Sequence, residues 1–164
     1  MQRPAAVLFA LALLLPLAGC GFQLRGQTAP LVTLGGPVQV VGLTFHDPLY
    51  RELQQSLHVA GASATTDSGG AVVLRISDRQ SNRRVLSVDN RNKAVEYELE
   101  ESFLFSVRDR DGNERAPEQR LRALRVIFNP EDEVLGRNRE EDLMRADMRR
   151  DLANRLVERL AAQL

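Results

Sequence analysis

The stretch from Val95 to Val107 constrains the fold most, because its side chains alternate between apolar and polar. Successive side chains of a β-strand point to opposite faces of the sheet, so this alternation predicts a strand with one buried face and one solvated face. The odd positions hold the apolar residues Val95, Tyr97, Leu99, Phe103, Phe105 and Val107, interrupted by Glu101. The even positions hold Glu96, Glu98, Glu100 and Ser102. We expect the apolar face of this sheet to be covered by a second layer.

The segment before this strand contains a strand signal, a helix signal and a loop. The apolar run over 38–43 is typical of a short buried strand. A helix is predicted to begin at Pro48, because Asp47 can cap its free amides and proline is tolerated at the first helical position. Gly61 is suited to end that helix, and the polar, glycine-rich residues 61–70 are typical of a loop.

Two further strands are predicted to pair with Val95–Val107. One begins at Val72, and 85–88 either continue it or start an extension. Turn residues at 89–92 then lead into the alternating strand. Asp111-Gly112 is typical of a hairpin turn, so 121–128 should return as its partner.

The C-terminal segment is predicted to be one long amphipathic helix. Asn138 and Glu141 resemble a capping pair, and Met and Leu residues recur at every fourth position as far as Leu164. Together these signals predict the α+β class: a small four-stranded, mostly antiparallel sheet with two helices packed on one face. We expect residues 38–164 to form this single domain, and no long exposed apolar stripe is predicted on it.

The N-terminus has the pattern of a lipoprotein signal. Arg3 precedes an uncharged apolar run, and Leu17-Ala18-Gly19-Cys20 resembles a bacterial lipobox. Cys20 is the only cysteine, so it cannot form an internal disulfide, and we expect it to be the lipid-attachment residue. Residues 1–19 would be the signal peptide and 20–37 the lipidated N-terminus and tether. Gly21, in a position where Asp favours retention at the inner membrane, predicts the outer membrane.

The charges balance overall but not locally. There are 22 basic and 22 acidic residues, and Lys93 is the only lysine. Codon bias or a need for forked hydrogen bonds to phosphates could each explain the excess of arginine. Basic residues concentrate between Arg75 and Lys93, which predicts either an edge protected by charge or a site for an anionic ligand or acidic partner. Nucleic acid is not expected at the predicted location.

No pattern typical of catalysis is found. The two histidines, His46 and His58, are not placed to complete a zinc site, and no nucleophile elbow or phosphate-binding loop is present. Three glutamates on one strand face are typical of a solvated surface. We therefore expect no enzymatic activity, no cofactor and no metal.

Several segments resemble the LPS-assembly lipoprotein family, LptE, where LPS is lipopolysaccharide. Similarity runs in order along the mature chain and is most specific at its beginning. The matching segments are Cys20-Gly21-Phe22-Gln23-Leu24-Arg25-Gly26, Leu53-Gln54-Gln55-Ser56-Leu57 with Gly61, Glu96-Tyr97-Glu98-Leu99, Phe128-Asn129-Pro130 and Leu135-Gly136-Arg137. The family often has histidine where this chain has Gln23.

The resemblance implies a non-enzymatic plug inside the large β-barrel subunit of the outer-membrane LPS translocon, of the LptD type. It also implies assistance in barrel assembly and binding of LPS. Arg137 occupies the place of one basic residue implicated in LPS binding, and Asn90 that of another, with Arg91 and Lys93 beside it. We expect Arg91, Lys93 and Arg137 to lie at a common end and to hold LPS head groups. The alternatives are an adaptor lipoprotein for another envelope complex or for peptidoglycan, and a lipid-anchored hydrolase.

Overall fold

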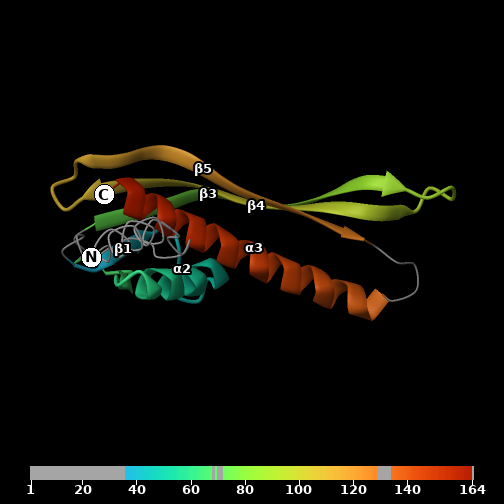
Figure 1. Cartoon of the computed structure of the whole chain (residues 1–164), viewed down its shortest axis with the longest axis horizontal. Helices are drawn as coiled ribbons and strands as arrows, with labels where there is room; N and C mark the ends of the chain where they lie inside the picture. The colour runs from blue at the N-terminus through green and yellow to red at the C-terminus, as the bar shows by residue number, and fades with distance from the viewer. Residues whose placement is uncertain (1–35, 68, 70–71, 129–133, 164) are drawn as a thin grey trace, which may run out of the picture.

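Three long antiparallel strands form the frame of the molecule in the computed structural model, which describes residues 36–67, 69, 72–128 and 134–163. The strands β3 (Val72–Val88), β4 (Ala94–Asp109) and β5 (Glu114–Phe128) follow one another through two hairpin turns. Figure 1 shows that they run along the long axis of the molecule. The predicted alternation of β4 is confirmed, because Leu99, Phe103 and Phe105 are buried.

Two short strands complete a five-stranded mixed sheet in the order β2-β1-β3-β4-β5. The strand β1 (Val38–Val41) lies parallel to β3 on one side and to β2 (Ala64–Thr65) on the other. The predicted count of four strands is therefore wrong, whereas the three long strands pair antiparallel and only the short strands β1 and β2 add parallel pairs. A two-residue strand is too short to show periodicity in sequence, and it lies in the segment interpreted as a loop.

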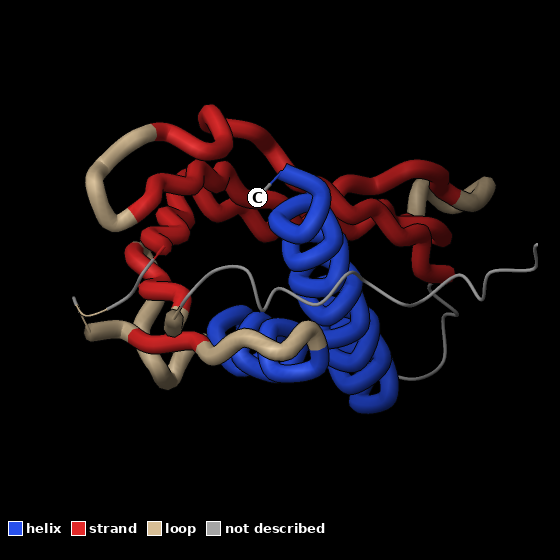
Figure 2. Tube along the Cα trace, turned by 60° about the vertical axis from the view of Figure 1, so that its left-hand side comes forward, coloured by secondary structure: helices blue, strands red, loops and turns tan. Residues whose placement is uncertain are grey.

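Two helices cover one face of the sheet, as predicted (Figures 1 and 2). The helix α2 (Pro48–Val59) begins where expected, with an Asp47 carboxylate oxygen accepting the Leu49 N–H at 2.8 Å. The helix α3 spans Val134–Gln163, so it begins earlier than the predicted capping pair. Apolar side chains of both helices, including Leu53 and Leu152, meet the buried face of the sheet in one core.

Gly42 lets the chain turn tightly between β1 and α2. Its φ of +95° lies in the left-handed region, and an added Cβ would lie 2.0 Å from the Ile76 carbonyl oxygen. Any larger residue would collide with the β3 backbone. This close approach lets α2 return directly beneath the sheet.

The sheet has a proximal half and a distal half, which meet at the paired residues Gln80, Ser102 and Arg122. The proximal half contains β2 and β1, and β1 pairs with β3 only as far as Arg75. The distal half comprises residues 80–88, 94–101 and 122–128, a three-stranded ribbon that ends in the β3–β4 turn (Figure 1). In the distal half, both β3 and β5 are edge strands.

Candidate functional site

The β3–β4 turn at the distal end is organised by Asp89. Its Oδ1 accepts the backbone N–H groups of Arg91 and Lys93, each at 2.8 Å, and its Oδ2 lies 3.2 Å from the Arg91 Nε. The Lys93 N–H contributes most to holding the pKa of the Asp89 carboxyl below its ordinary value. Asn92, with φ of +59°, completes the reversal. These hydrogen bonds preorganise the turn that carries two of the predicted LPS-binding residues.

The predicted site residues are only partly described by the structure. The Arg91 side chain is 59% exposed while paired with Asp89, so it is accessible to a ligand at the tip. Arg137 lies near the beginning of α3, and Figure 1 shows that this helix begins toward the same end of the molecule as the turn. The side chain of Arg137 lies outside the described residues, and so does the predicted lipid-attachment residue Cys20.

The basic stretch predicted between Arg75 and Lys93 is not a uniform positive edge. Acidic residues from other elements pair with its arginines. The pairs are Arg79 with Asp47, Arg83 with Glu141 and Arg84 with Glu98. Arg83 also lies over the Tyr97 ring, 4.5 Å from its centroid. These partners lie far away in the sequence or on a neighbouring strand, so the local sequence did not reveal them.

The outer face of the sheet, which points away from the helices, carries the row of glutamates from β4. Each one has a partner on a neighbouring strand. Glu96 accepts the Ser87 hydroxyl at 2.7 Å, Glu98 lies 2.8 Å from Arg84, and Glu100 lies 2.7 Å from Arg122. The row is therefore a cross-strand network in which Glu98 and Glu100 are neutralised by arginine and Glu96 accepts a hydroxyl, as expected for a structural surface and not for a catalytic pair.

A polar cluster on the inner face joins α3 to the distal half. The Arg145 guanidinium lies 2.9 Å from Glu101 and 2.8 Å from Glu141, and the Ser81 hydroxyl donates to Glu101 at 2.7 Å. The carboxylate of Glu101 and the guanidinium of Arg145 are both largely buried. Burial raises the pKa of Glu141, but hydrogen bonds from Arg145 and Arg83 outweigh it and hold this pKa below the ordinary value.

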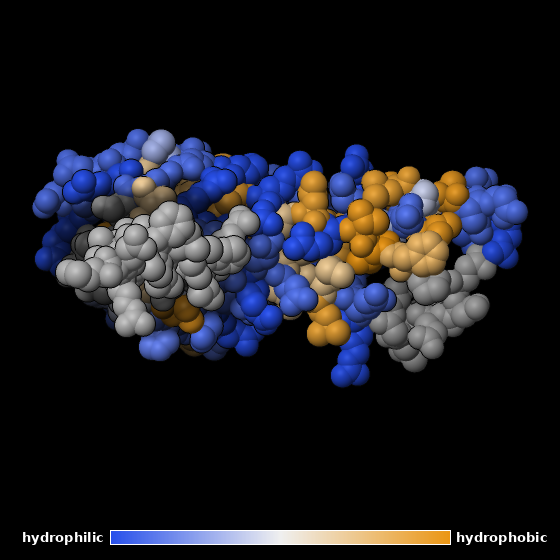
Figure 3. Space-filling view, in the orientation of Figure 1, coloured by the Kyte–Doolittle hydropathy of each residue, from blue (hydrophilic) through white to orange (hydrophobic). Residues whose placement is uncertain are grey.

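Exposed apolar side chains gather over the distal half of the sheet (right-hand part of Figure 3). They belong to the last residues of two strands. These are Val85, Leu86 and Val88 of β3 and Leu124, Val126 and Phe128 of β5. The prediction of no long exposed apolar stripe is therefore wrong. Residues 121–128 have apolar side chains at both odd and even positions, so hydrophobicity alone cannot show which face is exposed.

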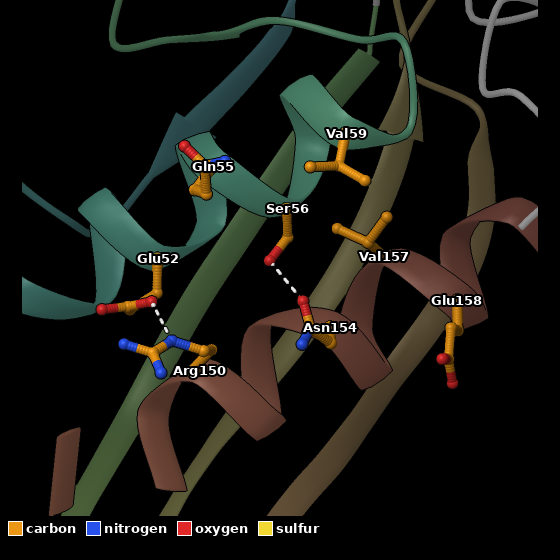
Figure 4. A pocket seen from close by; sticks show the side chains of 8 residues that line it. All are labelled: Glu52, Gln55, Ser56, Val59, Arg150, Asn154, Val157 and Glu158. Atoms are coloured by element: carbon orange, nitrogen blue, oxygen red, sulfur yellow. Dashed lines mark hydrogen bonds and ion pairs between the residues drawn. The ribbon is translucent and has the colours of Figure 1, made fainter. Parts of the chain in front are cut away.

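A cleft of about 250 Å³ separates α2 from α3 (Figure 4). The Ser56 hydroxyl donates to the Asn154 side chain across it at 2.7 Å, and Glu52 pairs with Arg150 at 3.3 Å. These contacts join polar side chains of the two helices across the cleft. Among the described residues there is no group of metal-ligating side chains, and none of the described helices is long and apolar enough to span a bilayer.

Comparisons with known proteins agree with the resemblance in sequence. A family model for LptE, lipopolysaccharide-assembly, matches residues 37–160. The LPS-assembly lipoprotein LptE of Photorhabdus laumondii is 31% identical over 160 residues, covering 97% of this chain and 86% of that protein. The LPS-assembly lipoprotein LptE of Pectobacterium atrosepticum is 27% identical over 148 residues, covering 87% and 77% respectively.

The fold has a solved counterpart. The crystal structure of the rare lipoprotein B from Shewanella oneidensis matches with a TM-score of 0.67 at 23% identity, over 77% of this chain and 95% of that one. This likeness concerns the fold alone. Because the family model covers most of the chain and the first relative extends over nearly all of it, the chain belongs to the LptE family of lipopolysaccharide-assembly lipoproteins.

Proposed function

We propose that this protein is a non-enzymatic outer-membrane lipoprotein, anchored through Cys20, that plugs the β-barrel subunit of the LPS translocon and supports its assembly. The observation that carries the proposal is the family match over residues 37–160. Residues 1–19 act as the signal peptide, 20–37 as the lipidated N-terminus and tether, and 38–164 as the plug domain. Several acyl chains on one cysteine hold a protein on its membrane, since each buried methylene contributes about 0.8 kcal/mol.

The surface of the domain supports a position inside a water-filled barrel. The lumens of wide barrels are polar, so a plug needs an outer face that is hydrated but carries no unpaired charge that resists enclosure. The glutamates of β4 meet this requirement, because Glu98 and Glu100 are neutralised by Arg84 and Arg122. The length of the three-stranded frame gives the domain an elongated form suited to a channel (Figure 1).

The β3–β4 turn supports the second part of the proposal, binding of LPS. Lipid A carries phosphates, and guanidinium and ammonium groups on a preorganised turn bind phosphate with little loss of backbone entropy. Asp89 holds that turn through the backbone N–H groups of Arg91 and Lys93. Arg137, near the start of α3, contributes a third cation from the same end of the molecule.

Co-isolation from gently solubilised membranes tests the plug. The full-length lipoprotein carrying an affinity tag should retain a large β-barrel protein in equimolar amount. Substitution of Cys20 by Ala should remove acylation and release the protein from the membrane. A wild-type lipoprotein that is isolated alone, or a barrel retained by an unrelated lipoprotein prepared in parallel, would contradict the proposal.

Charge reversal tests LPS binding. The triple substitution Arg91→Glu, Lys93→Glu and Arg137→Glu should weaken LPS binding at least tenfold, and raised salt should weaken binding by the wild type. The triple substitution Arg108→Glu, Arg110→Glu and Arg115→Glu, at the opposite β4–β5 turn, reverses the same number of charges and is the matched control for net charge. Equal binding by the triple variant and the wild type would refute the assignment of these residues.

A further inference from the structure

The distal part of β5 presents a backbone edge that no described strand pairs with, although the Leu124 carbonyl accepts the Arg125 guanidinium at 2.9 Å. The strand is last in the sheet order, so β4 is its only strand neighbour. On its other side, Arg155 of α3 donates to the Arg122 carbonyl at 3.3 Å, and Arg125 pairs with Asp151 of α3 at 3.3 Å. The helix thus contacts β5 as far as Arg125. An exposed strand edge is a template for pairing with another chain, and natural sheets usually protect it.

The other distal edge, on β3, has that protection. From Asp78 to Arg84 its residues are polar or charged. Where apolar residues follow, the β3–β4 register shifts between Val85 and Ser87, so a bulge interrupts the edge. Charges and bulges are two of the devices that prevent a new strand from adding.

Beyond Arg125, the last residues of β5, Val126–Phe128, carry neither charges nor a bulge. Pro117 and a register shift opposite Val107 protect its proximal part. From Gln119 to Phe128, however, the ladder with β4 is unbroken. Leu124, Val126 and Phe128 lie at alternate positions of this regular segment and are 37%, 56% and 61% exposed. Regular register and exposed apolar side chains therefore coincide only on this edge.

The distribution of charge across the outer face also indicates that the distal edge of β5 is not protected against strand addition. The inner strand β4 carries the glutamate row, whereas the edge strand carries the apolar row. If the sheet ended at β5, charged residues on β5 and apolar residues on β4 would protect its edge better. Because Glu98 and Glu100 are already neutralised, they would not repel a segment placed beside β5.

We propose that an extended segment of the barrel subunit adds to the edge of β5 over Leu124–Phe128, as one more strand of the sheet, and displaces the Arg125 guanidinium from the Leu124 carbonyl. Its apolar side chains, at every second position, cover Leu124, Val126 and Phe128. This inference rests on the proposed plug function and names how the partner is recognised. Acyl chains fit less well, because hydrocarbon against an open edge leaves backbone N–H and C=O groups without partners. A strand satisfies those groups and covers the apolar row together.

Amide hydrogen exchange on the full-length lipoprotein tests the pairing. The protein is compared alone, with excess LPS, and in the complex isolated with the barrel subunit. In the complex, the fast-exchanging amides of 121–128 should slow at least tenfold, while those of 114–119 on the proximal part of the same edge stay unchanged. Val126→Lys should reduce the retained barrel at least tenfold, because it places a charge in the apolar row. Val59→Lys, at an exposed valine of α2, should retain wild-type amounts.

Each other outcome overturns the pairing. Protection by LPS alone would assign the row to acyl chains, and protection that rises with protein concentration would assign it to a second copy. An unchanged exchange rate in the complex, or full retention by Val126→Lys, would exclude strand addition while leaving the plug intact. A wild-type preparation without any barrel subunit would instead contradict the proposed function, and this pairing with it.

Discussion

The proximal and distal halves of the sheet use the same three strands for different purposes. In the proximal half, both helices cover the inner face, and Phe103 and Phe105 are fully enclosed. In the distal half, fewer side chains are buried, among them Leu99 and Ile127; the polar cluster around Arg145 also joins α3 to the sheet, and apolar side chains of β5 face solvent. We therefore expect the proximal half to contribute more to stability and the outer face of distal β5 to be the surface available to other molecules. Four predictions follow this division, beginning with the largest expected effect.

Removing one phenyl ring from each half should give the largest difference in the free energy of unfolding. Phe103→Ala should lower the free energy of unfolding by about 3–5 kcal/mol, because it opens a cavity in the core. Phe128→Ala should change it by less than about 0.5 kcal/mol, since that ring is exposed. Urea titration of the soluble domain measures both values. Similar losses from the two variants would show that stability is not concentrated in the proximal half.

The polar cluster should be the main link between α3 and the distal half. Arg145→Met should cost about 3 kcal/mol, because it leaves the buried Glu101 carboxylate without its partner. Arg139→Met, at an exposed position of the same helix, is the control and should change stability by less than about 0.5 kcal/mol. If Arg145→Met proves as stable as its control, the cluster does not hold the helix.

Acid should weaken the same link by a smaller amount. The folded-state pKa of Glu141 is held below its ordinary value, so its contribution is present above about pH 4.3 and is lost as the pH falls through the folded pKa. The free energy of unfolding of the wild type should exceed that of Glu141→Gln by about 1 kcal/mol or less at neutral pH. The two curves should converge in acid. Parallel curves throughout the titration would exclude this contribution.

The smallest effect should be confined to the distal turn. Asp89→Ala removes the acceptor of the Arg91 and Lys93 N–H groups, so those amides should exchange faster with solvent. The core should not respond, because the turn lies beyond the region covered by the helices (Figure 1). Nuclear magnetic resonance of the amides measures the change. Loss of cooperative unfolding in this variant would mean that the turn supports the whole domain.

Local patterns predicted most of the fold, and long-range pairing accounts for what they missed. The Asp47-Pro48 start of α2 and the alternation of β4 depend on neighbours in sequence, and both are confirmed. The strand β2 forms only by pairing with β1, and α2 separates the two strands in the sequence, so no local signal predicts β2. The ion pair of Arg145 with Glu101 likewise joins residues from separate elements.

In the candidate site, too, features that depend on long-range pairing could not be predicted from local sequence. The turn that carries Arg91 and Lys93 was predicted from local turn chemistry. The apolar edge was not, because the residues from Leu121 to Phe128 are apolar at odd and even positions alike. The sheet order is needed to show that β5 is an edge strand, and therefore that its exposed apolar side chains lie beside an open edge.

The amount of barrel subunit retained by Val126→Lys, relative to wild type at equal lipoprotein level, tests the division between the halves most directly. The lysine lies on an exposed side of an edge strand, so the free energy of unfolding should stay within about 0.5 kcal/mol of wild type. The account predicts that the retained barrel nonetheless falls to a tenth or less. Undiminished retention by a variant of normal stability would contradict it.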